Sequence, residues 1–547
     1  CEHCASGCDM RTDVRRGKTL RRLAGDDSTV NEEWNCDKGR WAFKYVTSVD
    51  RLTTPMVRNA SGELVAASWP EALAAAAKGL KASKAAVLVG GRATYEDAYG
   101  YSKFARIALG TNDIDFRSRL SSNEEREFLA ARVVGSTTTY LDIDRADHVL
   151  LVGFEPEEES PIVFLRLNKQ VRKRALKVTA IATKLSIGVE KLKGEFVKVA
   201  PGAEAAAIAS QSLTSKSVIL VGERAAESAG VLSAVAALAD SSSAKIAWIP
   251  RRAGERGALE AGAIGNVLPG GRPVTDASAR VDIAAVWGTD SLPSAEGKST
   301  QEIYAAVNAG EIGALVVGGV DPLDGENSHS ALAALDKAFV VSLEIASSAV
   351  TQHADVVLPV AAVTEKSGSF LNWEGRPRSF DAAVQDSLNR SDLRILSMIA
   401  EEMGTSINLG TVTAAIKEIA SLGKWDGARA SMSKVSAAAQ PTVSGDQFIL
   451  TSWRRLLDLG TLQQGEEHLA GTARKTVAVI SPKRAGALGV VDGDKLKIST
   501  SLGSVTLSAL VEDIHDDALW APRNSRGSQL LVNLGVAHGA VVSVVKV

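Results

Sequence analysis

The stretch His148-Val149-Leu150-Leu151-Val152-Gly153 shows the pattern that determines the fold, a short apolar run that ends directly on glycine. Similar runs recur through the middle of the chain and alternate with alanine-rich, helix-forming stretches. This alternation predicts βα units that assemble into parallel sheets. The other predicted strands are 85–89, 177–181, 218–221, 283–287, 314–317, 340–343 and 355–358, and the predicted helices include 70–80, 205–213 and 225–239.

Glycine follows several of these runs, at Gly90, Gly153, Gly222, Gly288 and Gly318. In open α/β sheets the carboxyl ends of parallel strands are where ligands approach the backbone. The simpler interpretation is that these glycines only end strands. No G-x-G-x-x-G motif stands between a predicted strand and helix, and no G-x4-G-K-[ST] occurs. An ordinary NAD site and a P-loop are therefore not expected.

The composition is that of a globular protein. The chain has 547 residues, which suggests about three to four domains. Hydrophobic residues make up 45% and charged residues 23%, and the net charge of −2 argues against binding nucleic acid through bulk positive charge. The apolar runs are far shorter than the ~20 residues that cross a bilayer. Because the first residue is Cys1 and not Met, we expect that this is a processed or truncated piece.

Changes in composition and hydrophobic pattern along the sequence predict four units. Residues 1–65 form a small irregular domain with the cysteines, and 66–410 form interleaved Rossmann-like α/β domains. Residues 411–471 are expected to be helices and linker, and 472–547 a small barrel-like β domain. In that last unit, 495–499 and 504–508 alternate in polarity around Leu502-Gly503, which predicts a β-hairpin.

All four cysteines lie in the first 36 positions, with the spacing C-x2-C-x3-C-x27-C. A disulfide scaffold would spread its cysteines along a small secreted chain, so a metal site is the better interpretation. Structural zinc usually has two separated pairs, whereas three crowded cysteines and one remote one are typical of a 4Fe–4S cluster. Zinc and free thiols stay open as less favoured alternatives. The candidate ligands are Cys1, Cys4, Cys8 and Cys36.

The neighbours of the cysteines suggest how the site is tuned. His3 lies between two cysteines, but four thiolates already complete a cluster, so we expect His3 to face solvent or to lie just behind the ligands. Gly39 allows a tight turn and a close backbone approach. Lys38 and Arg40 place positive charge beside the candidate cluster, which would raise its potential. The alternative is a plain solvated basic turn. No H-E-x-x-H or nucleophile elbow occurs, so no catalytic residue is predicted.

The residues that follow Cys36, Asp37-Lys38-Gly39-Arg40, together with the cysteine spacing, resemble the amino-terminal cluster domain of molybdopterin oxidoreductases. The block 353–376 resembles the same superfamily, and 488–494 resembles its terminal β domain. Within that superfamily, 111–119 and 453–472 are similar to the 75-kDa-type iron–sulfur subunit, designated G, of bacterial NADH–quinone oxidoreductase, or respiratory complex I. The resemblance covers essentially the whole chain.

This resemblance implies a molybdopterin-oxidoreductase-like α/β fold with a small 4Fe–4S domain, Rossmann-like parallel-sheet domains and a C-terminal β-barrel-like domain. It implies an electron-transfer and scaffold subunit that is not catalytic alone, in the peripheral arm of a proton-pumping complex on the cytoplasmic side of the bacterial inner membrane. The implied partners are the flavin/NADH-binding subunit, a 2Fe–2S subunit and a ferredoxin-like two-cluster subunit, with no nucleic acid and with membrane contact only through the complex. Further 2Fe–2S and 4Fe–4S clusters are expected in a missing amino-terminal part.

Departures from the superfamily pattern concern its pterin cofactor. Active molybdenum enzymes offer a Cys, selenocysteine or Ser to the metal where this chain has 119–122, Arg-Leu-Ser-Ser, and a serine could serve. The phosphate-binding corners, often Gly-x-Asn-Pro, here carry Glu155 and Asp321 in place of the amide. A carboxylate ~4 Å from a phosphate charge repels it by about 4 kcal/mol at an effective dielectric of about 20. We therefore expect no molybdopterin.

Two other functions remain open. The chain could be an active molybdenum or tungsten pterin oxidoreductase of the formate-dehydrogenase type, in which Lys38 would relay electrons between cluster and pterin. It could also be a zinc-stapled assembly factor without a redox role. The identity of the metal separates these functions from the electron-transfer subunit.

Overall fold

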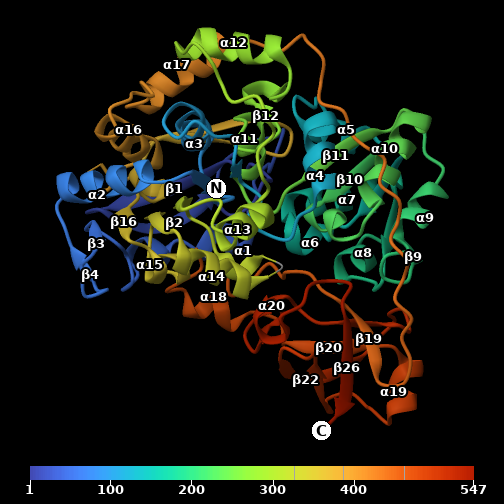
Figure 1. Ribbon diagram of the computed structural model, residues 1–547. Coiled ribbons are helices and arrows are strands. Elements are labelled where there is room, and N and C mark those ends of the chain that lie inside the picture. The colour runs from blue at the N-terminus through green and yellow to red at the C-terminus, as the bar shows by residue number, and fades with distance from the viewer. Residues whose placement is uncertain (326, 386, 461) are drawn as a thin grey trace.

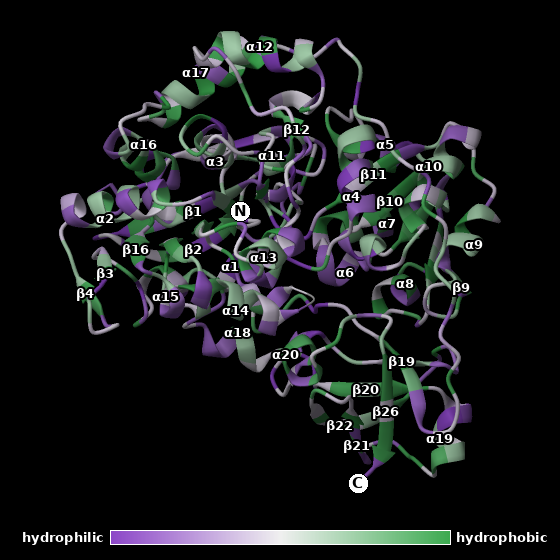
Figure 2. Ribbon diagram, viewed as in Figure 1, coloured by the Kyte–Doolittle hydropathy of each residue, from purple (hydrophilic) through white to green (hydrophobic). Residues whose placement is uncertain are grey.

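The computed structural model describes residues 1–325, 327–385, 387–460 and 462–547. Two helix-covered sheets lie side by side, and a closed β-barrel formed by the C-terminal part of the chain lies below them in Figure 1. The strands of the barrel are mostly hydrophobic, whereas helices such as α2 carry both hydrophobic and hydrophilic residues (Figure 2). Within the described ranges, no helix combines the length and the apolar character needed to cross a membrane.

The first sheet has seven strands in the order β4-β3-β16-β15-β14-β5-β6. Its five strands from β16 to β6 are parallel, and β3 and β4 run antiparallel at one edge. The strands are β3 (Met56–Arg58), β4 (Leu64–Ala66), β5 (Ala85–Val89), β6 (Ile114–Asp115), β14 (Ala314–Gly318), β15 (Phe339–Glu344) and β16 (Val356–Pro359). Residues 56–65, predicted to lie in the cysteine domain, therefore belong to the edge of this sheet.

Helices cover both faces of this sheet. In β5, Val87 and Val89 pack in one hydrophobic cluster with residues of α2 (Trp69–Lys81) and α3 (Tyr95–Ile107). Ala86 and Leu88 pack in another cluster with α13 (Thr300–Asn308) and α14 (Ser328–Lys337). Alternate side chains of a strand point to opposite faces, so a strand covered on both sides is apolar throughout. This is why the parallel strands stand out in the sequence.

The second sheet is inserted in the chain between β6 and β14. Its five parallel strands have the order β11-β10-β7-β8-β9. They are β7 (His148–Val152), β8 (Lys177–Ala182), β9 (Glu195–Lys198), β10 (Val218–Gly222) and β11 (Lys245–Ile249). Helices α7 (Pro161–Arg174) and α10 (Val231–Ser242) belong to this unit. The interleaving of two Rossmann-like units agrees with the predicted fold class.

The barrel closes in the order β19-β23-β20-β22-β21-β26. Its strands are β19 (Gln447–Thr451), β20 (Val477–Ile480), β21 (Lys495–Ser499), β22 (Ser504–Val511), β23 (Ala518–Trp520) and β26 (Val541–Lys546). The predicted hairpin is confirmed, since β21 and β22 pair antiparallel with Ser499 opposite Ser504. The barrel begins earlier than the predicted boundary at residue 472, because β19 pairs with both β23 and β26.

One predicted strand, 283–287, is wrong. These residues form the end of helix α12 (Ala277–Trp287), at the top of Figure 1. The Asp276 side chain accepts a hydrogen bond from the Ala279 amide and caps the helix, and Gly288 ends it in the left-handed conformation with φ 67°. Ala279, Ile283 and Trp287 are buried at intervals of four residues, so one helical face supplies the apolar side chains.

Candidate metal centre and the crevice beside it

The four predicted cysteine ligands gather beside the hairpin of β1 (Met10–Arg15) and β2 (Lys18–Ala24) and the short helix α1 (Asp37–Trp41). Cys36 caps α1, and its sulfur accepts a hydrogen bond from the Gly39 amide at 3.4 Å. A Cβ atom on Gly39 would lie 3.6 Å from the sulfur of Cys1 and 3.7 Å from that of Cys36. These two sulfurs, 35 positions apart in the sequence, therefore face the same bare glycine.

The electrostatics place the remaining cysteines at the same point. Burial raises the pKa of the Cys8 thiol well above its usual value, and the thiols of Cys4 and Cys36 raise it further. Burial also raises the pKa of Cys36 to about 11, with Cys4 as the next cause. The thiols of Cys4, Cys8 and Cys36 are thus close enough to influence one another's charge.

The donor set fits an iron–sulfur cluster. All four cysteines are free of disulfides. Buried thiolates that repel one another need a compensating positive charge, which iron supplies, and a cubane takes one thiolate at each of four irons. No group of three or more His, Cys, Asp or Glu side chains in the described parts of the chain could hold a single metal ion.

The loop between Cys4 and Cys8 is anchored on both α/β units. Gly7 has φ 79°, and a Cβ atom there would lie 2.5 Å from the Cβ of Asn372. The Trp373 amide donates to the Ala5 carbonyl at 3.0 Å, and the Tyr140 hydroxyl donates to the Ser6 carbonyl at 2.9 Å. Only glycine fits at position 7 without strain, because the backbone is left-handed and the neighbouring side chain is close.

The sequence predicts that His3 either faces solvent or lies just behind the ligands, and the structure shows that it does not face solvent. It is 3% exposed, and its Nε2 lies 2.8 Å from the Ala42 carbonyl, to which it donates. Burial lowers the pKa of His3 to about 3, so the ring is neutral. The adjacent Glu2 is also buried and pairs with Arg22 at 2.7 Å and with the Tyr45 hydroxyl at 2.9 Å. These contacts fix the chain between Cys1 and Cys4.

Lys38, two residues after Cys36, is buried in helix α1. Its Nζ is 3.9 Å from Oδ1 of Asp458, which comes from the segment after β19. Burial lowers the pKa of Lys38 to about 8, and Asp458 opposes this effect. Arg40 instead donates to the Asn35 side chain at 3.0 Å. Lys38 therefore connects the cysteine site with a crevice between the two sheets.

The two predicted carboxylates at the phosphate-binding corners are already bonded to backbone amides. Glu155, just after β7, accepts from the Glu158 amide at 3.1 Å and from the Gly188 amide at 3.0 Å. Asp321, after β14, accepts from the Leu323 amide at 3.0 Å. Burial raises the pKa of Glu155 to about 7 and that of Asp321 to about 6. Each side chain takes amides that such a corner would offer to a phosphate.

The loop 119–122 is also engaged in contacts within the protein. The Ser121 hydroxyl donates to the Gln301 side chain at 3.3 Å, and the Ser122 hydroxyl accepts from the Glu125 amide at 3.1 Å. Arg119 donates to the Glu125 carboxylate at 2.8 Å. The structure therefore uses these side chains to close the loop and to begin the helix that follows it.

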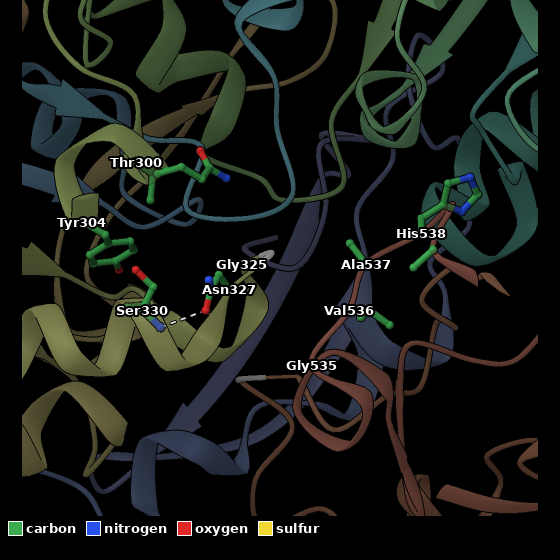
Figure 3. Close-up of a pocket in the computed structure, with 12 residues that line it drawn as sticks. Thr300, Tyr304, Gly325, Asn327, Ser330, Gly535, Val536, Ala537 and His538 are labelled. Atoms are coloured by element: carbon green, nitrogen blue, oxygen red, sulfur yellow. Dashed lines mark hydrogen bonds between the residues drawn. The ribbon is translucent and has the colours of Figure 1, made fainter. Parts of the chain in front are cut away.

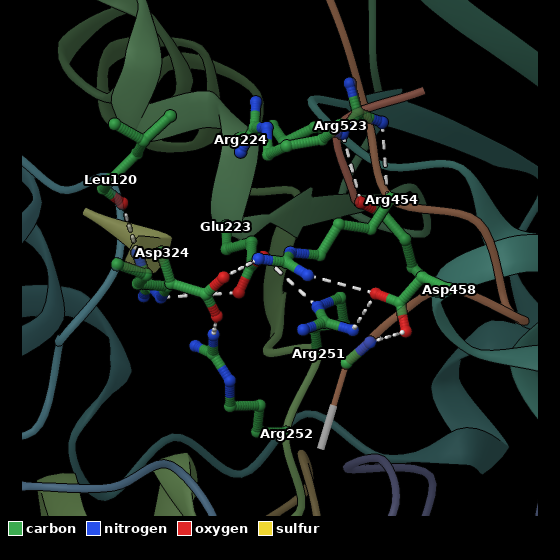
Figure 4. Close-up of polar contacts among 12 residues, drawn as sticks. Leu120, Glu223, Arg224, Arg251, Arg252, Asp324, Arg454, Asp458 and Arg523 are labelled. Carbon is green, nitrogen blue, oxygen red and sulfur yellow. Dashed lines mark hydrogen bonds and ion pairs between the residues drawn. The ribbon is translucent and has the colours of Figure 1, made fainter. Parts of the chain in front are cut away.

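A closed ring of ion pairs fills the crevice between the two sheets (Figure 4). Arginines and carboxylates alternate around it, and we call it the arginine–carboxylate ring. In order around the ring it consists of Asp324, Arg454, Asp458, Arg251, Glu223, Arg119, Glu255 and Arg252. The side chains are between 0% and 13% exposed, so the whole ring is screened from water.

The sequence alone does not reveal this ring. Its members come from segments that follow β6, β10, β11, β14 and β19, and no local motif joins them. Asp324 and Arg454, which bond each other, are separated by 130 positions. The one available signal is the position of charged residues just after predicted buried strands, as at Glu223. The carboxyl ends of such strands meet at one edge of a sheet.

Two cavities accompany the crevice. One of about 320 Å³ lies at the carboxyl ends of β5, β14 and β15, and Asp321 and Glu344 are among its lining residues. Burial raises the pKa of Glu344 to about 7. Another cavity, of about 600 Å³, lies between α13 and α14 on one side and the barrel segment 535–540 on the other (Figure 3). Its lining side chains include Thr300, Asn327 and His538 but none of the cysteines.

Comparison with known families assigns all three parts of the architecture. Residues 1–48 match the molybdopterin oxidoreductase Fe4S4 domain, 51–402 match molybdopterin oxidoreductase, and 448–544 match the molybdopterin dinucleotide binding domain. The structure resembles acetylene hydratase from Pelobacter acetylenicus with a TM-score of 0.65 over 95% of this chain and 92% of that one, at 13% identity. At this identity the likeness concerns the fold.

Similar sequences have a more specific name, the NADH-quinone oxidoreductase subunit designated G. That subunit of Mycobacterium bovis is 51% identical over 100% of this chain and 70% of its own length. Its counterpart in Streptomyces coelicolor is 48% identical over 100% of this chain and 69% of its own length. The resemblance inferred from the sequence, to this subunit within the molybdopterin oxidoreductases, is thereby confirmed. The chain belongs to this family of NADH-quinone oxidoreductase subunits and has the molybdopterin oxidoreductase fold with its Fe4S4 domain.

Proposed function

We propose that this chain is an iron–sulfur electron-transfer and scaffold subunit in the peripheral arm of an NADH-quinone oxidoreductase. Its 4Fe–4S cluster would be held by Cys1, Cys4, Cys8 and Cys36. The observation that carries this proposal is the gathering of four disulfide-free cysteines at one site within the matched Fe4S4 domain. A bound cluster supplies one-electron transfer, and the chain itself makes and breaks no bonds.

The surrounding residues would hold the thiolates and set the charge around them. The Gly39 amide bonds the sulfur of Cys36, and such a bond favours the thiolate over the thiol. Lys38 adds a buried positive charge two residues further on, which stabilises any group that gains negative charge on reduction. The anchored loop from Cys4 to Cys8 keeps its sulfurs in fixed positions, as metal ligation requires.

We further propose that the crevice binds no molybdopterin dinucleotide. Glu155 and Asp321 occupy the amides of the two phosphate-binding corners, and the arginine–carboxylate ring already pairs its own arginines within the crevice. Phosphate would approach buried carboxylates and lose its amide donors at once. These contacts also disfavour the alternative function, an active molybdenum or tungsten oxidoreductase.

The remaining parts of the proposal concern the assembly. The names of the relatives support a place in an NADH-quinone oxidoreductase complex. We propose that its neighbours there are the flavin/NADH-binding, 2Fe–2S and ferredoxin-like two-cluster subunits. We place the chain on the cytoplasmic side of the bacterial inner membrane, with further 2Fe–2S and 4Fe–4S clusters in the full-length subunit. Of the predicted unit boundaries, the one at residue 410 likewise remains a proposal.

Metal content tests the cluster directly. Iron, molybdenum, tungsten and zinc would be counted per complex by mass spectrometry after anaerobic purification, for the unchanged protein and for Cys36→Ala. We expect the variant to lose about four iron atoms, because one cubane holds four, with molybdenum and tungsten absent from both samples. Asn35→Ala, one position away, serves as the control and should keep its iron. Stoichiometric molybdenum or tungsten would refute the proposal, and zinc in place of iron would make the site purely structural.

Activity tests the position of the cluster in the electron path. We expect Cys36→Ala to lose local stability but to keep much of the NADH–quinone activity, because the connecting clusters would lie outside this chain. The steady-state rate would be measured on complex that is shown to be fully assembled. A complete loss of turnover in intact complex would mean that this cluster is an obligatory carrier.

A further inference from the structure

Every charged group of the arginine–carboxylate ring has two partners of opposite sign within the ring. Arg252 pairs with Glu255 at 3.1 Å and with Asp324 at 2.8 Å. Asp324 in turn also bonds Arg454, which pairs with Asp458 at 3.0 Å. The remaining ion pairs are longer, at 3.3 to 3.8 Å, and connect Arg251 and Arg119 with the carboxylates of Asp458, Glu223 and Glu255. The ring is thus a complete alternating circuit of charge.

The position of this ring is where open α/β folds place ligands, because strand ends from both sheets point into it. Arginine is the side chain best suited to hold carboxylates and phosphates, since its planar fork gives two parallel hydrogen bonds. The four buried arginines of the ring require anions. Here the anions are side chains that come from separate parts of the chain.

We propose that the carboxylates of Asp324 and Asp458 are built-in anionic ligands of these arginines and take the place of a phosphate-bearing cofactor. The proposal rests on the proposed absence of a dinucleotide and adds what replaces it. It follows that the crevice is a latent anion site, which the protein keeps closed with its own side chains. An oxyanion with two phosphoryl groups has the charge and the acceptors to bridge two arginines, so inorganic pyrophosphate is the appropriate probe.

Asp324 is the best position for a test. It bridges Arg252 and Arg454, which come from different units, and both of these partners lie outside the cysteine segment. Asp324→Asn keeps the shape of the side chain and removes only its charge. Both guanidinium groups would then keep one carboxylate each and have room for an external anion.

The experiment measures pyrophosphate binding to the full chain by calorimetry and thermal unfolding. We expect Asp324→Asn to unfold at a lower temperature, and millimolar pyrophosphate to restore part of the difference. The variant should bind pyrophosphate at least about tenfold tighter than the unchanged protein. Sodium chloride at equal ionic strength should not restore it. The absorbance of the cluster, recorded in parallel, shows whether the protein keeps its iron. A failure of the cluster proposal can then be distinguished from a failure of the anion-site proposal.

Glu227→Gln is the matched control, because it breaks another buried ion pair, with Arg523 at 2.7 Å, outside the ring. It should be destabilised but not rescued by pyrophosphate. Asp458→Asn and Glu223→Gln provide further ring variants if Asp324→Asn does not fold alone. Equal binding to the unchanged protein, rescue of the control, or failure of pyrophosphate to stabilise any ring variant would overturn the proposal.

Discussion

Gly7 is the residue on which the cysteine loop turns. Gly7→Ala would impose a left-handed backbone on a residue with a side chain, at a cost of roughly 1–2 kcal/mol. It would also place a Cβ atom 2.5 Å from that of Asn372, so Asn372 or the loop must move. We expect the variant to lose most of the iron held by this loop and to unfold more readily. Iron analysis and thermal unfolding of the same preparation check both effects.

Gly17→Ala is the control for this substitution. Gly17 has φ 72°, close to the φ of 79° at Gly7, but nothing lies within 4 Å of its added Cβ. It should therefore show only the backbone cost and keep its iron. If both variants retained a full iron content, the close approach to Asn372 would not matter for the site.

Glu155 should make stability depend on pH. Burial raises the pKa of Glu155 from 4.5 to about 7, so the folded protein holds its proton more tightly than the unfolded chain does. Its stabilising effect is complete below pH 4.5 and is lost as the pH rises through about 7. The full span is at most roughly 3 kcal/mol. Glu155→Gln should remove this part of the slope in denaturant unfolding measured across that range, and an unchanged slope would contradict the assignment.

At the scale of elements, α12 provides a test of the corrected assignment. The Asp276 side chain caps this helix by accepting from the Ala279 amide at 3.0 Å. Asp276→Ala should cost about 1 kcal/mol and speed amide exchange within α12. Asp290→Ala, which lies beyond the helix, should leave exchange there unchanged. Slow exchange in both variants would mean that the cap contributes nothing.

Most other elements could be predicted from the sequence. β5 and β7 match the predicted ranges 85–89 and 148–152, because a strand buried on both faces is an unbroken apolar run with glycine after it. The run 283–287 is misleading because five apolar residues rich in alanine fit a strand or one buried turn of helix equally well. β19 could not be recognised because its pairing partners lie far along the chain.

The candidate site divides in the same way. The cysteines and Lys38 could be found because a short local spacing indicates their chemistry. The arginine–carboxylate ring could not, since each of its charges looks like an ordinary solvated residue until the fold buries it. Glu223, for example, directly follows a strand in the sequence but finds its arginines at positions 119 and 251. Long-range pairing of this kind leaves no periodic signal in a single sequence.

At the scale of the whole molecule, the barrel is fixed to the second sheet by a buried ion pair. Arg523 of the barrel domain holds the Glu227 carboxylate with two hydrogen bonds of 2.7 Å. Burial alone would raise the pKa of Glu227, but the guanidinium outweighs it and the pKa lies below the usual value. Glu227→Gln should cost about 3–5 kcal/mol, because it leaves Arg523 buried without its counter-charge. Thermal unfolding and proteolysis of the connecting segment 423–446 would measure the loosening.

An exposed pair within the barrel gives the comparison. Lys483 contacts Asp516 at 3.1 Å with its side chain 78% exposed. Lys483→Ala should change stability by no more than about 1 kcal/mol, since solvent screens such pairs. Similar losses in the two variants would show that burial of the Arg523 pair adds little to the attachment of the barrel.

The arginine–carboxylate ring can close only late in the synthesis of the chain. Arg454 and Asp458 are the last members of the ring to be synthesised. The other members are Arg119, Glu223, Arg251, Arg252, Glu255 and Asp324. Until Arg454 and Asp458 have been synthesised, the ring is open between Asp324 and Arg251, and the contacts between the two sheets are incomplete. The ring can close only after residue 458 has been synthesised, so the segment between β19 and β20 completes the contacts between two sheets that are already present in the nascent chain.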